Sequence, residues 1–436
     1  MILRRDIWIL CGIAVITFLF AMSIHNEEIS KTAESSENLI QSTSINFDSV
    51  QKIVLHKEGR ELEFTLNDGE WWQVFPFEMR MDSASMLALI RSVQGVQQIG
   101  NITEETKLST LGLGDDSNWI SLSDGKETVT IYLGRKTLAG RAYAKVGDLP
   151  PVIVNQSLHR RAIDMDYKLW RDVRLFPDFQ IEGDSIERVV KGNRLLIQRL
   201  SGRWEMNEPV NARVDNENLT EWIGRLAAMR VGSYVIDEPT NLEMFGLLNP
   251  VATFSVSDRN ETTHKLLIGG RVSANSEDRY VMLAGRPVVF KIQWKILSEL
   301  FPAPEIFIDS TGSAISRFDI KRVTIRSENS EIFLIRNLEQ WLDKNGVPFD
   351  TSKVDALLTW LLETKPPSVA IGEYPKSDEI ATVTLEGYDL KPLDTIRVAS
   401  NPSGGVILEN GDNVLRLHPD DSGEILQTFI NYLQVN

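Results

Sequence analysis

Three stretches of this chain repeat one order of residues, and this internal repeat limits the folds that the chain can adopt. In the first two copies a tryptophan is followed five residues later by a proline, and the proline is followed six residues later by an aspartate. The third copy has two residues fewer between its tryptophan and its aspartate. The repeated residues are Trp71, Pro76 and Asp82, then Trp204, Pro209 and Asp215, then Trp341 and Asp350. We therefore expect three related modules.

Each aspartate precedes a segment with the spacing of an amphipathic helix. From the fourth residue after the aspartate, apolar residues fall at i, i+3, i+4 and i+7 in every copy. An aspartate side chain accepts a hydrogen bond from a free N–H of the first turn, and its charge favours the positive end of the helix dipole. We therefore expect Asp82, Asp215 and Asp350 to be helix caps and not catalytic acids.

Strand-like segments flank each predicted helix. Two runs that end near the tryptophan form a hairpin pattern, and three or four strands and a closing helix follow the first helix. The first two copies share a Gly-Leu turn, Gly112-Leu113 and Gly246-Leu247, which the third copy lacks. This order predicts an α+β fold, with an antiparallel or mixed β-sheet, a capped helix and a closing helix in each module.

An apolar run without a charge, at residues 7–24, is long enough to cross about 30 Å of hydrocarbon as a transmembrane helix. Arg4 and Arg5 precede this run and glutamates follow it, so the positive-inside rule places residues 1–6 in the cytoplasm. We expect a single-pass protein of the cytoplasmic (inner) membrane with an extracytoplasmic, periplasmic body. The alternative is a cleaved signal peptide, because Ala21-Met22-Ser23 has the form of a cleavage site.

The rest of the chain divides by composition and by the repeat. Residues 25–46 are rich in Ser, Thr, Glu and Asn without apolar periodicity, which predicts a flexible stalk. We expect repeat modules at residues 47–179 and 180–309 and a divergent third module at residues 310–436. Each module has roughly 130 residues, which is enough for a core of its own.

Charge and cysteine content exclude some classes of partner and site. The formal net charge is −15, which repels the phosphate backbone, so we expect no nucleic-acid partner. The single cysteine, Cys11, lies inside the apolar run. It excludes an internal disulfide and a zinc site built from cysteines.

The repeated residues resemble the bacterial domain-of-unknown-function 4340 family, whose pattern leads from a hairpin through Trp, Pro and a capping Asp to a Gly-Leu turn and a short Arg-Asp stretch. The first copy carries that stretch as Leu169-Trp170-Arg171-Asp172, whereas the second shows Leu300-Phe301-Pro302-Ala303 at the expected place. The resemblance extends from about Phe47 to the C-terminus. It implies one N-terminal membrane helix and, by association, a place beside ABC-transporter components of the gliding-motility auxiliary type.

No motif indicates a catalytic residue, a cofactor or a metal ion. The five histidines, at positions 25, 56, 159, 264 and 418, have no metal-ligand spacing, and no G-x-S-x-G motif of a hydrolase nucleophile is present. Carboxylates are abundant, but nothing selects a pair of them for acid–base work. We therefore expect no enzyme activity and no small-molecule cofactor.

The tryptophans remain as candidates for contact with a ligand or partner. Trp71, Trp204 and Trp341 recur at the ends of the predicted hairpins, where a ring that covers the helix is the simpler interpretation. Trp72 points to the opposite face of a regular strand. It is the candidate exposed contact.

These observations favour a non-enzymatic, membrane-anchored scaffold or accessory protein. Its partners are expected to be envelope or transporter membrane proteins, together with the lipid bilayer at residues 7–24. One alternative is a carbohydrate- or peptidoglycan-binding envelope protein, which a groove of exposed Trp or Tyr would favour. The other is a cryptic hydrolase, which a deep cleft with two facing carboxylates would favour.

Protease treatment tests the predicted topology. Because charge asymmetry and span length agree, protease added to spheroplasts should digest the body of the protein, and the body should sediment with membranes. Complete protection, or a soluble mature protein that begins near Ile24, would contradict an anchored protein with an outside body.

Overall fold

The computed structural model describes residues 37–41, 43–102, 106–176, 184–257, 263–328, 330–419 and 423–435. The chain divides into two compact units, Met1–Val173 and Arg174–Asn436. The predicted transmembrane helix at residues 7–24 and residues 25–36 of the predicted stalk lie outside the described residues. Among the residues that are described, none of the helices combines the length and apolarity that crossing a membrane requires.

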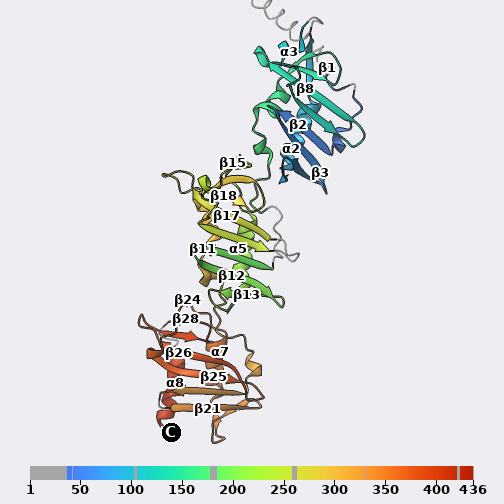
Figure 1. The fold of residues 1–436 in the computed structure, drawn as a ribbon. Helices are drawn as coiled ribbons and strands as arrows, with labels where there is room; N and C mark the ends of the chain where they lie inside the picture. The colour runs from blue at the N-terminus through green and yellow to red at the C-terminus, as the bar shows by residue number, and fades with distance from the viewer. Residues whose placement is uncertain are drawn as a thin grey trace, which may run out of the picture. The chain divides into compact units, whose positions relative to one another are not determined.

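The first unit is built on one antiparallel sheet with a helix against one face (Figure 1). Its elements are β1 (Glu37–Asn38), β2 (Lys52–Lys57), β3 (Arg60–Asn67), β4 (Glu70–Phe75), β5 (Met79–Arg80), α2 (Ser83–Gln94), β6 (Gln97–Asn101), α3 (Leu108–Leu111), β7 (Asn118–Ser123), β8 (Thr128–Lys136), β9 (Arg141–Val146), β10 (Val152–Asn155) and α4 (Ser157–His159). The strand order is β1-β6-β10-β9-β8-β7-β2-β3-β4-β5. From β2 the chain therefore starts in the middle of the sheet, runs to the β5 edge, crosses to β6 on the other side and fills the gap, while β1 pairs with the outer side of β6.

The second module repeats this layout. Its elements are β11 (Ser185–Val190), β12 (Asn193–Leu200), β13 (Arg203–Glu208), β14 (Ala212–Arg213), α5 (Asn216–Ala227), β15 (Ser233–Asp237), η5 (Glu243–Phe245), β16 (Ala252–Ser257), β17 (Thr263–Arg271), β18 (Arg279–Leu283), β19 (Val288–Ile292), α6 (Trp294–Leu297) and η7 (Pro304–Phe307). The strand order, β14-β13-β12-β11-β16-β17-β18-β19-β15, matches that of the first sheet without β1.

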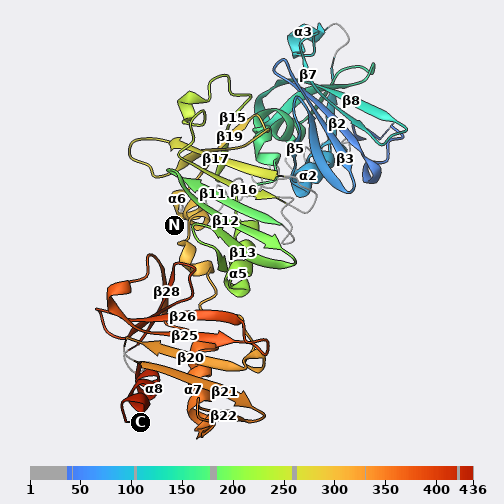
Figure 2. The ribbon, with the colours of Figure 1, turned by 60° about the horizontal axis from the view of Figure 1, so that its bottom comes forward.

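The third module repeats it again. Its elements are β20 (Arg322–Ser327), β21 (Ser330–Asn337), β22 (Gln340–Leu342), β23 (Pro348–Phe349), α7 (Thr351–Leu362), β24 (Ser368–Ile371), η9 (Lys376–Asp378), β25 (Glu379–Glu386), β26 (Pro392–Ser400), β27 (Val406–Glu409), β28 (Val414–His418) and α8 (Gly423–Val435). The strand order is β23-β22-β21-β20-β25-β26-β27-β28-β24. Figure 2 shows α7 and α8 on the same side of this sheet.

The three sheets confirm the predicted α+β class and the repeat, and all their strand pairs are antiparallel. The predicted two-stranded hairpin is extended, because the tryptophan lies on a third strand and a short fourth strand follows it. The predicted closing helix is short in the first two modules, at α4 and α6, and long only as α8.

The core of each module lies between one sheet face and the helix that follows the signature aspartate. Strands β2, β3 and β4 bury every second residue, which is the pattern of a sheet with one covered face. Helix α2 buries the predicted stripe. These residues are Met86, Leu89, Ile90 and Val93. Burying each such side chain contributes about 1.5–3 kcal/mol, so this contact dominates the energy of the module.

Part of the predicted stalk is folded onto the first module. Glu37 and Asn38 form β1 and pair with Gln98 and Gln97 of β6. Ile40 and Ile45 are buried. The sequence pattern misses this contact because two buried residues five positions apart match neither a helix nor a strand period.

The second and third modules are in contact within the second unit. Val414 of β28 belongs to the second module's core, and Val369 and Ile371 of β24 pack against it. The linker between the modules is held from both sides: Arg213 donates to the Thr311 carbonyl oxygen at 2.9 Å, and Asn410 donates to that of Gly312 at 2.8 Å. The predicted boundary between residues 309 and 310 therefore falls in a linker bonded to both modules.

The signature aspartates are N-caps, as expected. Asp82 accepts a hydrogen bond from the Ser85 amide at 2.8 Å, and Asp215 and Asp350 accept equivalent bonds in α5 and α7. Neighbouring donors lower the pKa of Asp350, first the Ser352 hydroxyl and then its amide, which fits a carboxylate that serves as a hydrogen-bond acceptor.

Replacing a cap tests this role. Asp82→Ala should lower the free energy of unfolding by about 1 kcal/mol in urea denaturation, because it leaves an amide of the first turn without a partner. Asp215→Ala should have a similar effect, whereas Asp82→Asn should retain most of the stability. Loss of partner binding by Asp82→Ala at unchanged stability would show that the residue has another role.

Candidate functional site

The signature tryptophans lie in three separate cores. Trp71, Trp204 and Trp341 are 4%, 8% and 2% exposed, and each faces the helix of its own module. Pro76 and Pro209 follow cis peptide bonds in the turns after them. Because each tryptophan ring is buried within its own module, none of the three offers a free face to a ligand.

The Gly-Leu turns lie on the outer face of the sheet, opposite the helix. Gly112 and Gly246 have φ values of 74° and 65°, in the left-handed region. Each turn meets a glycine of a strand. A Cβ on Gly134 would lie 2.4 Å from the Leu111 carbonyl oxygen, and one on Gly269 would lie 2.2 Å from that of Phe245. The repeated glycines therefore allow backbone to pack directly on backbone.

Trp72, the candidate exposed contact, is half-buried. It lies next to Thr65 and Arg80 on the adjacent strands, on the sheet face opposite Trp71. Its position on the other face agrees with the strand pattern, but it stands apart from the other outward aromatic rings of this sheet.

The other outward rings of the first sheet form a row together with a lysine. His56, Trp119, Tyr132 and Lys145 are successive partners on β2, β7, β8 and β9. The His56 and Trp119 rings are stacked with centroids 5.6 Å apart, and the Lys145 ammonium lies 5.5 Å from the Tyr132 ring. One face of Trp119 and one face of Tyr132 are thus occupied by neighbours, which leaves less ring surface for a stacked sugar.

The corresponding row of the second sheet is apolar. Val189, Thr253, Leu267 and Met282 occupy the same strand positions. The segment that contains η5 packs on this row, with Leu247 buried against Met282. The second module therefore covers part of its own outer face.

The row of the third sheet is charged. Arg326, Thr382, Arg397 and Glu409 are successive partners on β20, β25, β26 and β27. Glu409 is completely buried and accepts a hydrogen bond from Arg397 Nε at 2.8 Å. The Arg397 guanidinium lies 4.5 Å from the ring of Tyr374, and burial is the main cause that raises the pKa of that phenol. The same row of the repeat is thus largely aromatic in the first module, mostly apolar in the second and mostly charged in the third.

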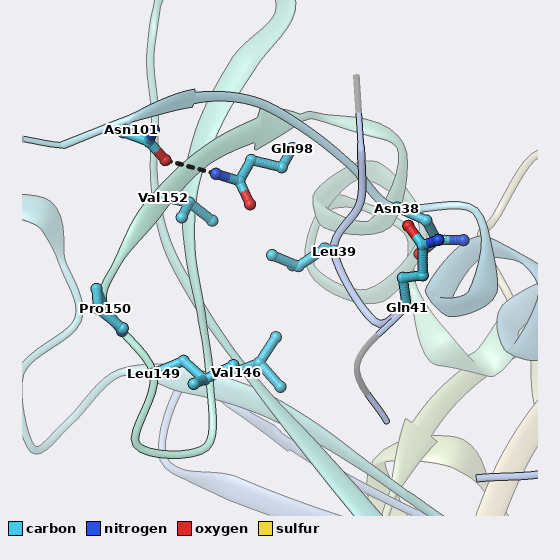
Figure 3. A pocket seen from close by; sticks show the side chains of 9 residues that line it. All are labelled: Asn38, Leu39, Gln41, Gln98, Asn101, Val146, Leu149, Pro150 and Val152. Atoms are coloured by element: carbon cyan, nitrogen blue, oxygen red, sulfur yellow. Dashed lines mark hydrogen bonds between the residues drawn. The ribbon is translucent and has the colours of Figure 1, made fainter. Parts of the chain in front are cut away.

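One candidate site is a cavity of about 490 Å³ at the β6 edge of the first sheet (Figure 3). It is lined by Asn38, Leu39, Gln41, Gln98, Asn101, Val146, Leu149, Pro150 and Val152. They come from β1 and the turn after it, from β6, and from β9, β10 and the loop between them. The cavity exists because β1 and its turn bring chain from outside the repeat to this edge.

The lining of this edge cavity is neutral. Four side chains are carboxamides, which donate and accept hydrogen bonds, and five are apolar. Gln98 donates to Asn101 Oδ1 at 2.6 Å along one side of the cavity (Figure 3). Asn38 donates to the Gln94 carbonyl oxygen at 2.8 Å, which fixes the turn to α2. Without a titratable group, the lining can bind and orient a ligand but supplies no acid or base.

The residues that the structure describes include no cluster of three His, Cys, Asp or Glu side chains able to hold a metal ion. His264 lies on β17, and His418 is buried on β28 with its ring 5.7 Å from that of Trp360. Burial, followed by the charge of Arg416, lowers the pKa of His418. These histidines lie on different strands of different sheets.

An ion pair that the sequence pattern missed recurs in the first two modules. Arg80 lies 3.5 Å from Asp172, and Arg213 lies 3.4 Å from Asp309. The second module's counterpart of residues 169–172 is therefore 306–309, not 300–303. The amide of each capping aspartate shows the same match, because it donates to the carbonyl oxygen of Trp170 or Phe307. The final aspartate was the available signal, but it lies 94 residues after the capping aspartate in the second module and 90 residues after it in the first, and this difference hid the alignment.

A family model matches the middle of the chain. Residues 204–386 match "Domain of unknown function (DUF4340)". The match begins at Trp204 on β13 and ends at Glu386 on β25, so it includes parts of both modules of the second unit. Over these residues the match supports the family resemblance of the sequence.

Comparisons with curated proteins and with solved structures give no support for a shared fold or function. No curated protein matches the sequence. Among solved structures, the Ca²⁺-stabilized adhesin that helps an Antarctic bacterium reach out and bind ice aligns over 86% of this chain and 92% of its own, at 10% identity and a TM-score of 0.08. A TM-score that low supports neither a shared fold nor a shared function.

The close backbone approach of the Gly-Leu turn is testable. Gly269→Ala should lower the free energy of unfolding by about 1–3 kcal/mol, because the turn has to move away from the strand. Gly224→Ala, in the exposed middle of α5 with no atom within 4 Å of the new Cβ, should stabilise by up to about 1 kcal/mol. Equal urea midpoints for Gly269→Ala and the unchanged protein would contradict the close approach.

Proposed function

Residues 204–386 match the DUF4340 family, and from that premise we propose that this protein is a non-enzymatic scaffold or accessory protein that binds other envelope proteins. The observation that carries the proposal is the edge cavity, whose nine lining residues are all carboxamide or apolar. Such a surface offers affinity without acid, base or metal chemistry. Its volume falls within the range of binding pockets, roughly 300–1,000 Å³.

The chemistry of the edge cavity favours an extended polypeptide segment as its ligand. Peptide groups carry one donor and one acceptor each, and carboxamides match both without a charge to desolvate. The chain itself already adds a strand here, because β1 pairs with Gln97 and Gln98. Among the described residues, β1 reaches only these two of the five residues of β6, so the edge has room for further backbone.

The setting that we propose is the outer side of the cytoplasmic membrane. The apolar residues 7–24 would anchor the chain, and the preceding arginines favour an extracytoplasmic body. The family resemblance supports an ABC-transporter or gliding-type envelope complex as the assembly that it joins, by association and not by geometry. The outer rows of the three modules differ in chemistry. This difference favours a distinct contact with another protein for each module over three identical contacts.

The lining of the edge cavity supports neither of the two alternatives. A saccharide site needs free aromatic faces, whereas the edge cavity has no aromatic lining and the Trp119 ring is stacked on His56. A glycoside hydrolase needs two facing carboxylates, and the lining of the edge cavity has none.

Site-specific crosslinking tests the proposal. A photoreactive amino acid in place of Leu149, which is 50% exposed at the rim of the edge cavity, should yield a protein adduct in intact cells. The same group in place of Leu338, which is 90% exposed in the third module, serves as the control and should not yield that adduct.

A second substitution links the adduct to the cavity. Gln98→Glu keeps the shape of the side chain but adds a charge, and it should lower the adduct yield about tenfold, equivalent to about 1.4 kcal/mol. Identical adducts from Leu149 and Leu338, or a Leu149 adduct unchanged by Gln98→Glu, would argue against the edge cavity as the binding site. A glycan adduct would favour the carbohydrate alternative.

A further inference from the structure

Three loops at one end of the third sheet present apolar side chains to solvent. They are η8 (Arg317–Asp319), the turn between β21 and β22, and the turn between β25 and β26. The start of β20 pairs with the ends of β21 and β25, so the three loops lie at the same end of neighbouring strands (Figure 2). Four of their side chains, 47–90% exposed, are called here the apolar tips: Phe318, Leu338, Tyr388 and Leu390.

Contacts at the base of the loops join them into one surface. The Lys321 ammonium lies 5.6 Å from the ring of Tyr388 and donates to the carbonyl oxygen of Arg336. The Arg336 guanidinium in turn donates to the carbonyl oxygen of Arg317, in η8, at 3.3 Å. Adjacent strands of a sheet are only about 4.8 Å apart, so the tips are close neighbours.

Leu338 occupies a backbone conformation that suits leucine poorly. Its φ is 55°, in the left-handed region. The hairpin pairs Asn67 with Glu70 in the first module and Asn337 with Gln340 in the third, which makes Asp68 the counterpart of Leu338. Aspartate adopts this conformation more readily than leucine, because its short side chain can form local hydrogen bonds there.

Leu390 repeats the same departure in the next turn. Asp124 accepts from the Lys126 amide at 2.9 Å, and Asp389 accepts from the Lys391 amide at 3.1 Å. The residue between them has a φ of 86° in the first module, where it is glycine, and of 61° in the third, where it is Leu390. The third copy thus places two exposed leucines in strained backbone. They add little to the core, so we look for their role outside the module.

The charge around the apolar tips differs from that of the chain. The whole chain has a formal net charge of −15. The matching end of the first module is acidic, with Asp48, Asp68, Asp124 and Glu127 around Lys126. Around the tips, three cations balance three anions: Lys321, Arg336 and Lys391 against Asp319, Glu339 and Asp389. An anionic surface therefore repels this end less than it repels the rest of the body.

We propose that the apolar tips insert into the surface of a lipid bilayer. The tips stand on separate loops, an arrangement that suits a fluid surface better than a single rigid ligand. The amphipathic ring of Tyr388, with Lys321 beside it, matches the headgroup level of a bilayer.

A bilayer is within reach of the third module. The apolar residues 7–24 are long enough to anchor the chain, and an anchor raises the effective concentration of bilayer for every module that follows it. The inference rests on the membrane setting proposed above, and it adds a contact that would hold the third module at the surface.

Fluorescence quenching on the full-length protein in vesicles tests this proposal. Cys11→Ser removes the single cysteine, after which Leu338→Cys or Asp68→Cys provides one position for an NBD label. The vesicles consist of phosphatidylcholine and phosphatidylglycerol with a nitroxide lipid. Inserted side chains lie roughly 5–10 Å deep, so the label at residue 338 should be quenched at least about threefold more than the label at residue 68.

A double variant links the quenching to the other tips. Leu390→Gly with Phe318→Ser should lower quenching at residue 338 to the level at residue 68. Its melting temperature should stay equal or rise, because glycine adopts the left-handed backbone without strain and both side chains are exposed. Leu138→Ser changes an equally exposed leucine of the first module and should leave quenching at residue 338 as it is.

Three outcomes would overturn the proposal. They are equal quenching of the two labels, full quenching in the double variant, and a label at residue 338 that is shielded from aqueous iodide but not quenched by the nitroxide lipid. The last would identify a protein, such as a second copy of the chain, as the cover of the tips. Crosslinking from Leu149 should be the same in the double variant, so failure here is distinct from failure of the proposed scaffold function.

Discussion

Everything in each module depends on one helix that carries the chain across the sheet. The four strands that precede the helix run from the middle of the sheet to one edge, and the strand that follows it lies at the opposite side, where only β1 of the first module lies beyond it. Only an element that crosses the covered face can join them, and α2, α5 and α7 each do so in 12 residues. Their apolar stripes cover the sheet face along the way. The same helix therefore joins the two sides of the sheet and forms the core with it. The capping aspartate sets where the crossing begins.

This constraint explains which parts of the repeat are alike. The stripe, the tryptophan and the cap all serve the crossing and its core, and all three copies keep them. The outer face takes no part in the crossing or in the core. The row of outward side chains that begins at His56 is largely aromatic in the first module, and the matching rows are mostly apolar in the second and mostly charged in the third. Differences between copies of one chain thus separate residues that fold the module from residues available for contacts.

The sequence predicts the core far better than the candidate sites, for a physical reason. Helix and strand periods report burial against a neighbour, which is how the stripe from Met86 to Val93 and the alternation in β2 to β4 become visible. The edge cavity depends on Asn38 and Leu39, which return to β6 from a segment without any period.

The strand order also sets a sequence of events for a chain that emerges from its N-terminus. Strand β24 pairs with β28 and no other strand of its sheet, and the three strands β25, β26 and β27 lie between them in the chain. The backbone groups of β24 therefore find partners only after those three strands and β28 have been made. A chain cut short before β28 keeps an open gap of one strand beside β27 and lacks Val414, which also contributes to the second module's core. Completion of the third sheet in this way requires that the chain has been made as far as β28.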